Sequence, residues 1–250
     1  MTKRVFTSAL VRGVLSPGIA IALGIALALP ASAAGPIRTV VYRYSVESQG
    51  FAGSVSTGQG GAVSEDGSIG TAGSTGTVRA DVVEATTDGG LVVDVTQTVD
   101  RALRPMQTVR CAVYGATQDV VCDQNLTITS AERVLLAYFG RFFYDPSRVG
   151  ADGRFQIEPK VIPANMTIEN DYTVKKKAGD DVTLDVHRLE RTGAYQSTTD
   201  GSIVYNAARS VPESIVLDMR AVRSGSQSDM NVHLTMLSDS MAPAGGQNSH

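Results

Sequence analysis

The sequence TSAERVLLAYFGRFFY (residues 129–144) is the one stretch of the chain with the pattern of an amphipathic helix. Its apolar side chains recur at spacings of three and four residues, which places them on one face of a helix. They are Ala131, Val134, Leu135, Tyr138, Phe139 and Phe142. Thr129 and Glu132 have the spacing of a capping box at the helix N-terminus. We therefore expect one helix over about residues 129–144, with the rest of the chain arranged around it.

On both sides of this helix, apolar and polar residues alternate with a period of two, which is typical of half-buried strands. The strands expected from this pattern cover residues 39–47, 77–85, 91–99, 155–158, 166–177, 182–191, 203–206, 214–223 and 231–237, with a hairpin in 108–123. Asp-Gly pairs such as Asp88-Gly89 and Asp200-Gly201 favour tight antiparallel turns. Because a single helix offers little for parallel crossovers, we expect a mainly β (β-rich α+β) fold. In this fold a strongly curved antiparallel sheet or half-barrel surrounds the helix.

The N-terminus has the order of a secretory signal peptide: basic residues, an apolar run over 14–29, and the small residues Ala31-Ser32-Ala33. The alternative is a retained membrane anchor, against which the short run and its Pro and Gly residues count. We expect a signal peptide over 1–33 and no membrane span after its cleavage. The protein should then be exported, to the periplasm or outside the cell.

The remaining chain is long enough for one sizeable core. We expect a single β-rich domain over 34–238, which includes a Gly/Ser-rich loop or hairpin over 50–76. The small, polar residues 239–250 are expected to be a disordered tail.

Net charge argues against polyanionic partners. Removing residues 1–33 leaves 19 basic and 25 acidic residues, a charge of −6. A mildly acidic protein without a basic patch is a poor candidate for binding nucleic acid or anionic membrane surfaces. The run Lys175-Lys176-Lys177 is the exception, but lysines on an edge strand more often prevent association between sheet edges.

The two cysteines, Cys111 and Cys122, lie in the expected hairpin. If residues 116 and 117 form a two-residue loop, the residue numbers of every facing pair in the hairpin add up to 233. The numbers of Cys111 and Cys122 do so, and the two cysteines therefore face each other directly. We expect a structural disulfide, as is common in exported chains. The alternative, a redox-active or metal-binding pair, lacks a C-x-x-C spacing and a nearby His.

Motifs for catalysis are scarce. The chain has no G-x-S-x-G nucleophile motif, calcium loop, phosphate-binding glycine loop or dinucleotide fingerprint. His187, Asp185 and His233 could form a cluster for proton transfer or metal binding if their strands are neighbours. The alternative is that these are solvent-facing residues of separate strands. We therefore predict no catalytic residue, metal or cofactor.

The aromatic end of the helix is the candidate binding region. Leu136, Phe143 and Tyr144 lie partly off the main apolar face, and a curved sheet can leave an apolar groove beside them. The predicted binding residues are Leu136, Tyr138, Phe139, Phe142, Phe143 and Tyr144. The alternative is that these side chains only complete the core.

The order of strands, one aromatic helix and further strands over residues 39–237 resembles that of the LolA-like periplasmic half-barrel carriers and of uncharacterised exported β-rich bacterial proteins. This resemblance implies an apolar ligand such as a lipid, but no family motif assigns binding residues. We expect an envelope protein that is a non-catalytic binding module for an apolar ligand or a partner segment. One alternative is a structural or interaction protein of the envelope without a ligand pocket. A hydrolase is a further, less favoured alternative.

Overall fold

The computed structural model describes residues 35–50, 70–100, 107–114, 119–123, 126, 128–140, 143–157, 166–193, 195–223 and 226–241. Contacts divide the chain into residues 1–34 and a second unit, Gly35–His250, to which all the described residues belong. The expected signal peptide, the loop tip at 116–117 and Phe142 lie outside the described residues. So does most of the Gly/Ser-rich segment, whereas Gly70 to Gly76 belong to a strand.

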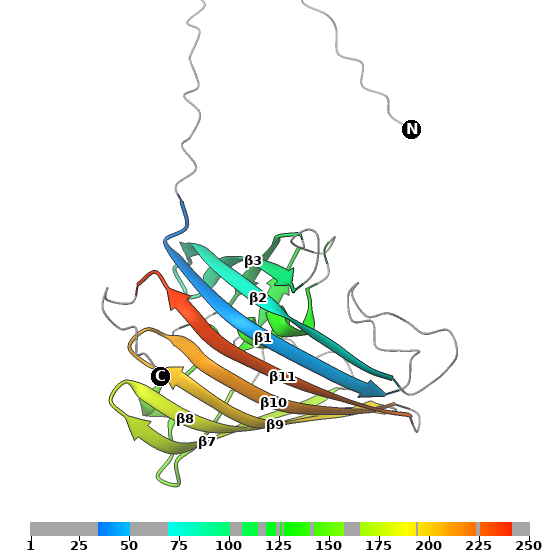
Figure 1. Ribbon diagram of the computed structural model, residues 1–250. Helices are drawn as coiled ribbons and strands as arrows, with labels where there is room; N and C mark the ends of the chain where they lie inside the picture. The colour runs from blue at the N-terminus through cyan, green and yellow to red at the C-terminus, as the bar shows by residue number, and fades with distance from the viewer. Residues whose placement is uncertain are drawn as a thin grey trace, which may run out of the picture. The chain divides into compact units, whose positions relative to one another are not determined.

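Eleven strands form one antiparallel sheet (Figure 1). They are β1 Arg38–Gly50, β2 Gly70–Ala85, β3 Leu91–Val99, β4 Val109–Val113, β5 Val120–Cys122, β6 Arg154–Gln156, β7 Thr167–Ala178, β8 Asp181–Thr192, β9 Tyr195–Asn206, β10 Val211–Arg223 and β11 Ser226–Asp239. Their order across the sheet is β5-β4-β3-β2-β1-β11-β10-β9-β8-β7-β6. Two meanders, β1 to β5 and β6 to β11, are thus joined in the middle by the pairing of β1 with β11.

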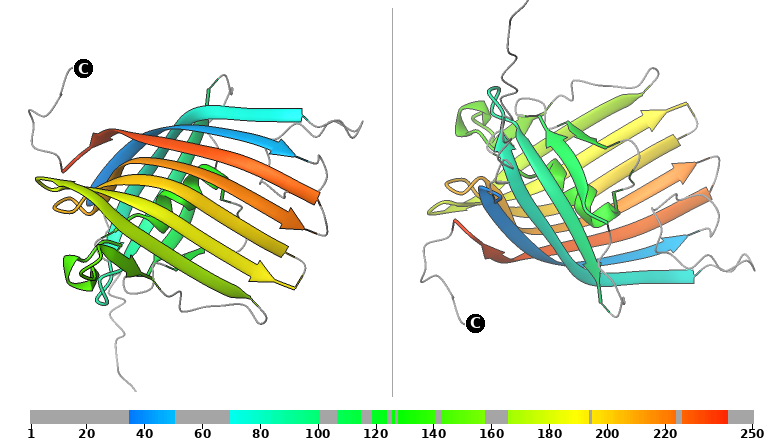
Figure 2. Two further views of the ribbon diagram at one scale, coloured as in Figure 1. Left: turned by 90° about the horizontal axis from the view of Figure 1, so that it is seen from below. Right: turned by 90° about the horizontal axis from the view of Figure 1, so that it is seen from above.

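The sheet is strongly curved and open, with β5 and β6 at its two edges (Figure 2). Helix α1, Ser130–Ala137, lies on the concave side, in the part of the chain that connects one edge to the other. The helix contacts β1, β3, β5 and β11. The expected fold class, a mainly β protein with a curved antiparallel sheet or half-barrel around one helix, is confirmed.

Helix α1 begins as the sequence predicts and ends earlier. Thr129 accepts a hydrogen bond from the Glu132 amide, and the Glu132 carboxylate accepts one from the Thr129 amide at 2.7 Å. The helix ends at Ala137, so the expected extension to residue 144 is wrong. The chain turns away at Gly140, whose φ of 112° favours glycine and whose amide donates to the Ser210 carbonyl.

Strand β9 corrects a second expectation. The Asp200-Gly201 pair was expected to form a turn, but it lies inside β9, where Asp200 faces His187 of β8 and Gly201 faces Leu217 of β10. A Cβ atom at Gly201 would lie only 2.1 Å from the Val216 carbonyl oxygen. Glycine therefore serves here for the close approach of two backbones within the sheet.

The predicted pairing of the cysteines is confirmed. Cys111 of β4 faces Cys122 of β5, and their sulfur atoms are 2.07 Å apart, the distance of a disulfide bond. Cys111 is buried on the concave side with Val109 and Val113. The bond thus ties the outermost strand to the core.

At the other end of the chain, the described residues include the first three of the segment expected to be a tail. Asp239 is the last residue of β11, and the Ser240 amide donates to the Thr39 carbonyl of β1.

Candidate functional site

The concave face of β1 and β7 to β11 is organised in rows of residues that face one another across neighbouring strands. The first row consists of Val174, Leu184, Ile203, Ile215, Leu234 and Tyr44. The second consists of Tyr172, Val186, Gly201, Leu217, Val232 and Val46. Apart from Gly201, both rows have apolar or aromatic side chains, so this part of the concave face is the core of the protein.

The third row, called here the boundary row, has a different character. It consists of Asn170, Arg188, Thr199, Met219, Met230 and Ser48. Its β7–β9 half is polar, whereas Met219 and Met230 supply two thioethers that pack against the core while remaining partly exposed. Methionine side chains adapt to ligands of irregular shape. The boundary row therefore places two apolar side chains beside its polar β7–β9 half on one concave surface.

Arg188 is the charged member of the boundary row. Its Nε atom donates to Oε1 of Glu190 at 2.8 Å, and its Nη2 atom contacts the same oxygen. Burial raises the pKa of Tyr138 to about 12, and the positive charge of Arg188 opposes that rise. Burial likewise raises the pKa of Tyr172, with Arg188 opposing it again. The guanidinium group thus lies near two phenol groups where the aromatic core meets the polar half of the row.

Within the described part of the chain, three buried polar side-chain atoms have no hydrogen-bond partner: Gln97 Oε1, Asn170 Oδ1 and the Tyr144 hydroxyl oxygen. Gln97 uses its amide nitrogen to donate to Tyr44, and Asn170 uses its own to donate to the Ile157 carbonyl at 2.9 Å. Leaving a buried acceptor without a donor costs about 1–3 kcal/mol. Asn170 belongs to the boundary row, so one such acceptor lies at the candidate site itself.

Five of the six predicted binding residues are buried in helix α1 or just after it, and Phe142 lies outside the described residues. Leu136, Phe139 and Phe143 are fully buried, and Tyr138 and Tyr144 are 5% exposed. The ring of Phe143 makes edge contacts with Tyr138 at 5.1 Å and with Tyr172 at 5.3 Å, measured between ring centres. Tyr138, Phe143 and Tyr144 belong to an aromatic cluster that reaches Tyr172 in the second row. Their part in ligand binding stays a prediction.

The histidine cluster considered from the sequence does not form. His187 lies on β8 and His233 on β11, and β9 and β10 run between these strands. At the usual spacing of strands the two residues are at least about 14 Å apart. His187 instead contacts Asp200, with 2.6 Å between Nδ1 and Oδ1. The described residues hold no group of three or more His, Cys, Asp or Glu side chains that could bind a metal.

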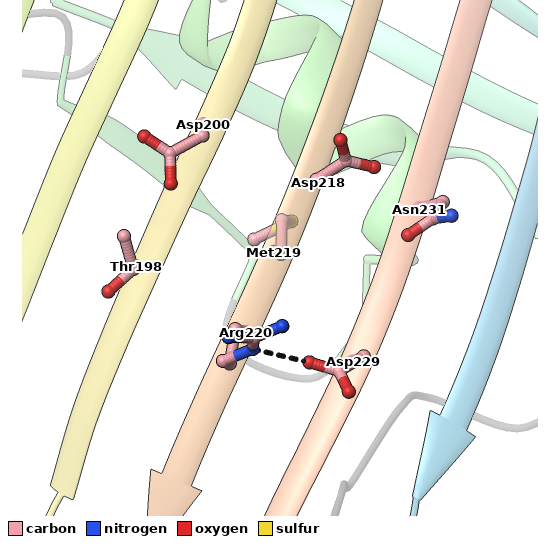
Figure 3. Close-up of a pocket in the computed structure, with 7 residues that line it drawn as sticks. All are labelled: Thr198, Asp200, Asp218, Met219, Arg220, Asp229 and Asn231. Atoms are coloured by element: carbon pink, nitrogen blue, oxygen red, sulfur yellow. Dashed lines mark hydrogen bonds and ion pairs between the residues drawn. The ribbon is translucent and has the colours of Figure 1, made fainter.

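The convex face carries two hollows, lined mostly by polar residues, that share Asp200. The larger has a volume of about 450 Å³ and is shown from the side away from α1 (Figure 3). Asp200 and Asp218 face each other across β9 and β10, and Arg220 pairs with Asp229 at 3.0 Å. These side chains are largely exposed, as expected for the solvent face of an antiparallel sheet.

No protein-family model matches the chain, and no curated protein matches it. A solved structure described as "Lipid-protein interactions in lipovitellin" has a TM-score of 0.47 and 11% sequence identity over 86% of this chain. The match covers 26% of that protein's length. At this level of similarity we draw nothing about function from it.

Across the described residues, no helix is both long enough and apolar enough to cross a membrane.

The boundary row was not predicted from the sequence. Its members come from six strands, and each alone has only the signal of a residue at every second position in a strand. Knowing which residues face one another requires the register between strands, which no local pattern contains.

Proposed function

We propose that this chain is an exported, non-catalytic binding module that holds the apolar part of a ligand on the concave face of its sheet. The observation that carries the proposal is the boundary row. There, Met219 and Met230 continue the apolar surface beyond the buried core and remain partly exposed. Partly exposed thioethers on a concave face are suited to contact with an alkyl chain.

The aromatic cluster supports the same proposal from the interior. Phe143 packs against Tyr138 and Tyr172, and Tyr172 lies in the row next to the boundary row. Leu136, Tyr138, Phe139, Phe143 and Tyr144, with Phe142 assigned from the sequence, are proposed as the apolar floor beside which the ligand lies.

Export is part of the proposal. The disulfide bond between Cys111 and Cys122 fits an oxidising compartment, where disulfides persist. The signal-peptide pattern of residues 1–33 points in the same direction.

The test is native mass spectrometry of the mature protein purified from its exporting host, followed by denaturing extraction of any bound molecule. We expect a stoichiometric lipid or other apolar molecule. Met230→Gln should reduce its occupancy, because Met230 lies on the concave face of β11. Leu237→Gln is the matched control, since Leu237 lies on the same strand and is 58% exposed. A bare mass, together with no uptake from lipid vesicles, would contradict the proposal.

The complete burial of Leu136, Phe139 and Phe143 favours a second candidate, an envelope interaction protein without a ligand pocket. In that case residues 51–69, between β1 and β2, are the proposed contact segment. Replacing them with a short turn should abolish association with envelope partners while thermal stability stays nearly unchanged. Association that survives the replacement would exclude this role.

A further inference from the structure

We propose that the ligand of the concave face is an amphiphile with a carboxylate head that also carries a hydroxyl group, and that Arg188 binds this head. The inference rests on the proposed function and specifies its substrate class. It is carried by three observations: the position of Arg188, its ion pair with Glu190, and the unpartnered acceptor of Asn170.

Arg188 is placed where an amphiphile would change from apolar to polar. It lies in the boundary row between Asn170 and Thr199, on the side of the row away from Met219 and Met230. Its side chain is 33% exposed, so it is partly open to solvent and partly shielded from it. An arginine in such a position can bind a carboxylate with two parallel hydrogen bonds.

Glu190 acts as a resident carboxylate for Arg188. It lies two residues further along β8, on the same face, and its side chain is 23% exposed. A ligand carboxylate can replace it on the guanidinium group, after which Glu190 turns to water. After this exchange no charge is both buried and unpaired. A buried, unpaired charge would otherwise be the main free-energy cost of binding an ion here.

Asn170 supplies the argument for a hydroxyl group. It directly faces Arg188 across β7 and β8, is 8% exposed, and has no donor for its Oδ1 atom. Its amide nitrogen is committed to the Ile157 carbonyl, which fixes the orientation of the amide. A carboxylate alone would place a second acceptor beside Oδ1, whereas a neighbouring O–H group would donate to it.

The test uses a dansyl-labelled long-chain fatty acid and its methyl ester as fluorescent probes, and an unlabelled 2-hydroxy fatty acid as a competitor. In the wild-type protein the acid should bind at least about tenfold more tightly than the ester, the size expected of a charge-assisted hydrogen bond. The 2-hydroxy acid should displace the probe at a lower concentration than the plain acid of equal length.

Variants test the proposed contacts of Arg188 and Asn170 with the ligand separately. Arg188→Gln should remove the preference for acid over ester, and Asn170→Leu should remove only the preference for the hydroxy acid. Arg191→Gln is the matched control, because Arg191 lies on the same strand, faces the opposite side and is exposed. Glu190→Gln should strengthen binding of the acid by removing its competitor.

Equal binding of acid and ester by the wild-type protein would overturn the inference and leave the proposed function standing. So would equal effects of Arg188→Gln and Arg191→Gln. Binding of neither probe would overturn both the inference and the proposed function.

Discussion

Arg38 and Asp239, at the start of β1 and the end of β11, form a bidentate ion pair. Arg38 donates from Nε to Oδ1 at 3.0 Å and from Nη2 to Oδ2 at 2.6 Å. The Asp239 side chain is fully buried, and that of Arg38 is 11% exposed. The third guanidinium nitrogen of Arg38 donates to the Arg209 carbonyl at 2.6 Å, which fastens the turn between β9 and β10 to the same pair.

Asp239→Asn should lower the free energy of unfolding by about 3–5 kcal/mol, because it leaves Arg38 with a buried, uncompensated charge. Urea denaturation at neutral pH measures the change. Asp229→Asn is the control on the same strand, since its partner Arg220 is 66% exposed and an exposed pair contributes about 1 kcal/mol or less. Equal losses in the two variants would show that the buried pair has no special role.

The same ion pair should make the free energy of unfolding depend on pH in the acid range. Burial of the Asp239 carboxyl would raise its pKa, but hydrogen bonds from Arg38 and the Met241 amide, with the charges of Arg38 and Arg209, outweigh burial and lower it. The unfolded chain therefore binds a proton at Asp239 more readily than the folded chain. The stabilisation is present above the unfolded pKa of about 3.9 and is lost as pH falls through the lower folded pKa.

The difference in unfolding free energy between wild type and Asp239→Asn should accordingly shrink as the pH falls below about 4. Urea titrations at a series of pH values test this expectation. A difference that stays constant down to about pH 3 would contradict it.

Gly201→Ala should destabilise the sheet by about 1–3 kcal/mol, as inserted atoms do in a closely packed interior. The added methyl group would lie 2.1 Å from the Val216 carbonyl oxygen and force β9 and β10 apart. Gly193→Ala is the control, because a methyl group there meets no described heavy atom within 4 Å. The Gly201→Ala variant should unfold at a clearly lower temperature than the Gly193→Ala variant. Equal midpoints of thermal unfolding would refute the close approach of β9 and β10.

Loss of the Cys111–Cys122 bond should lower the free energy of unfolding by about 3 kcal/mol, the value for a loop of this length. The two cysteines are 11 residues apart in sequence. Urea unfolding of the double variant Cys111→Ser/Cys122→Ser measures the loss, and a reductant should shift the wild type but not the variant. An unshifted wild type would mean that the bond does not restrict the unfolded chain.

Local patterns in the sequence predicted most of the elements. The alternation in residues 91–99 gave β3 with its observed bounds, and the spacing of Thr129 and Glu132 gave the cap of α1. The pairing of Cys111 with Cys122 could be predicted from the register of one short hairpin. Each of these signals lies within a few residues of the feature that it predicts.

The errors arose where distant contacts override a local pattern. Asp200-Gly201 has the chemistry of a turn, yet both residues pair with strands on either side. The apolar residues beyond Ala137 have helical spacing, but Gly140 bonds to Ser210 and the aromatic side chains pack as a non-helical cluster. The candidate site was missed for the same reason, because Asn170, Arg188 and Met219 lie in one row only through the register of four strands.

The pairing of β1 with β11 also bears on how the chain folds. Tyr44 faces Leu234, so the middle of the sheet joins residues 190 positions apart, since 234 − 44 = 190. Contacts between residues so far apart in the sequence form slowly, because the intervening chain must lose its freedom before they can stabilise it. During synthesis β1 has β2 as its early neighbour, and its other edge stays open until the last strand is made. The centre of this sheet is therefore among the last parts that a growing chain can complete, and until then the unpaired edge of β1 is open to pairing with other chains.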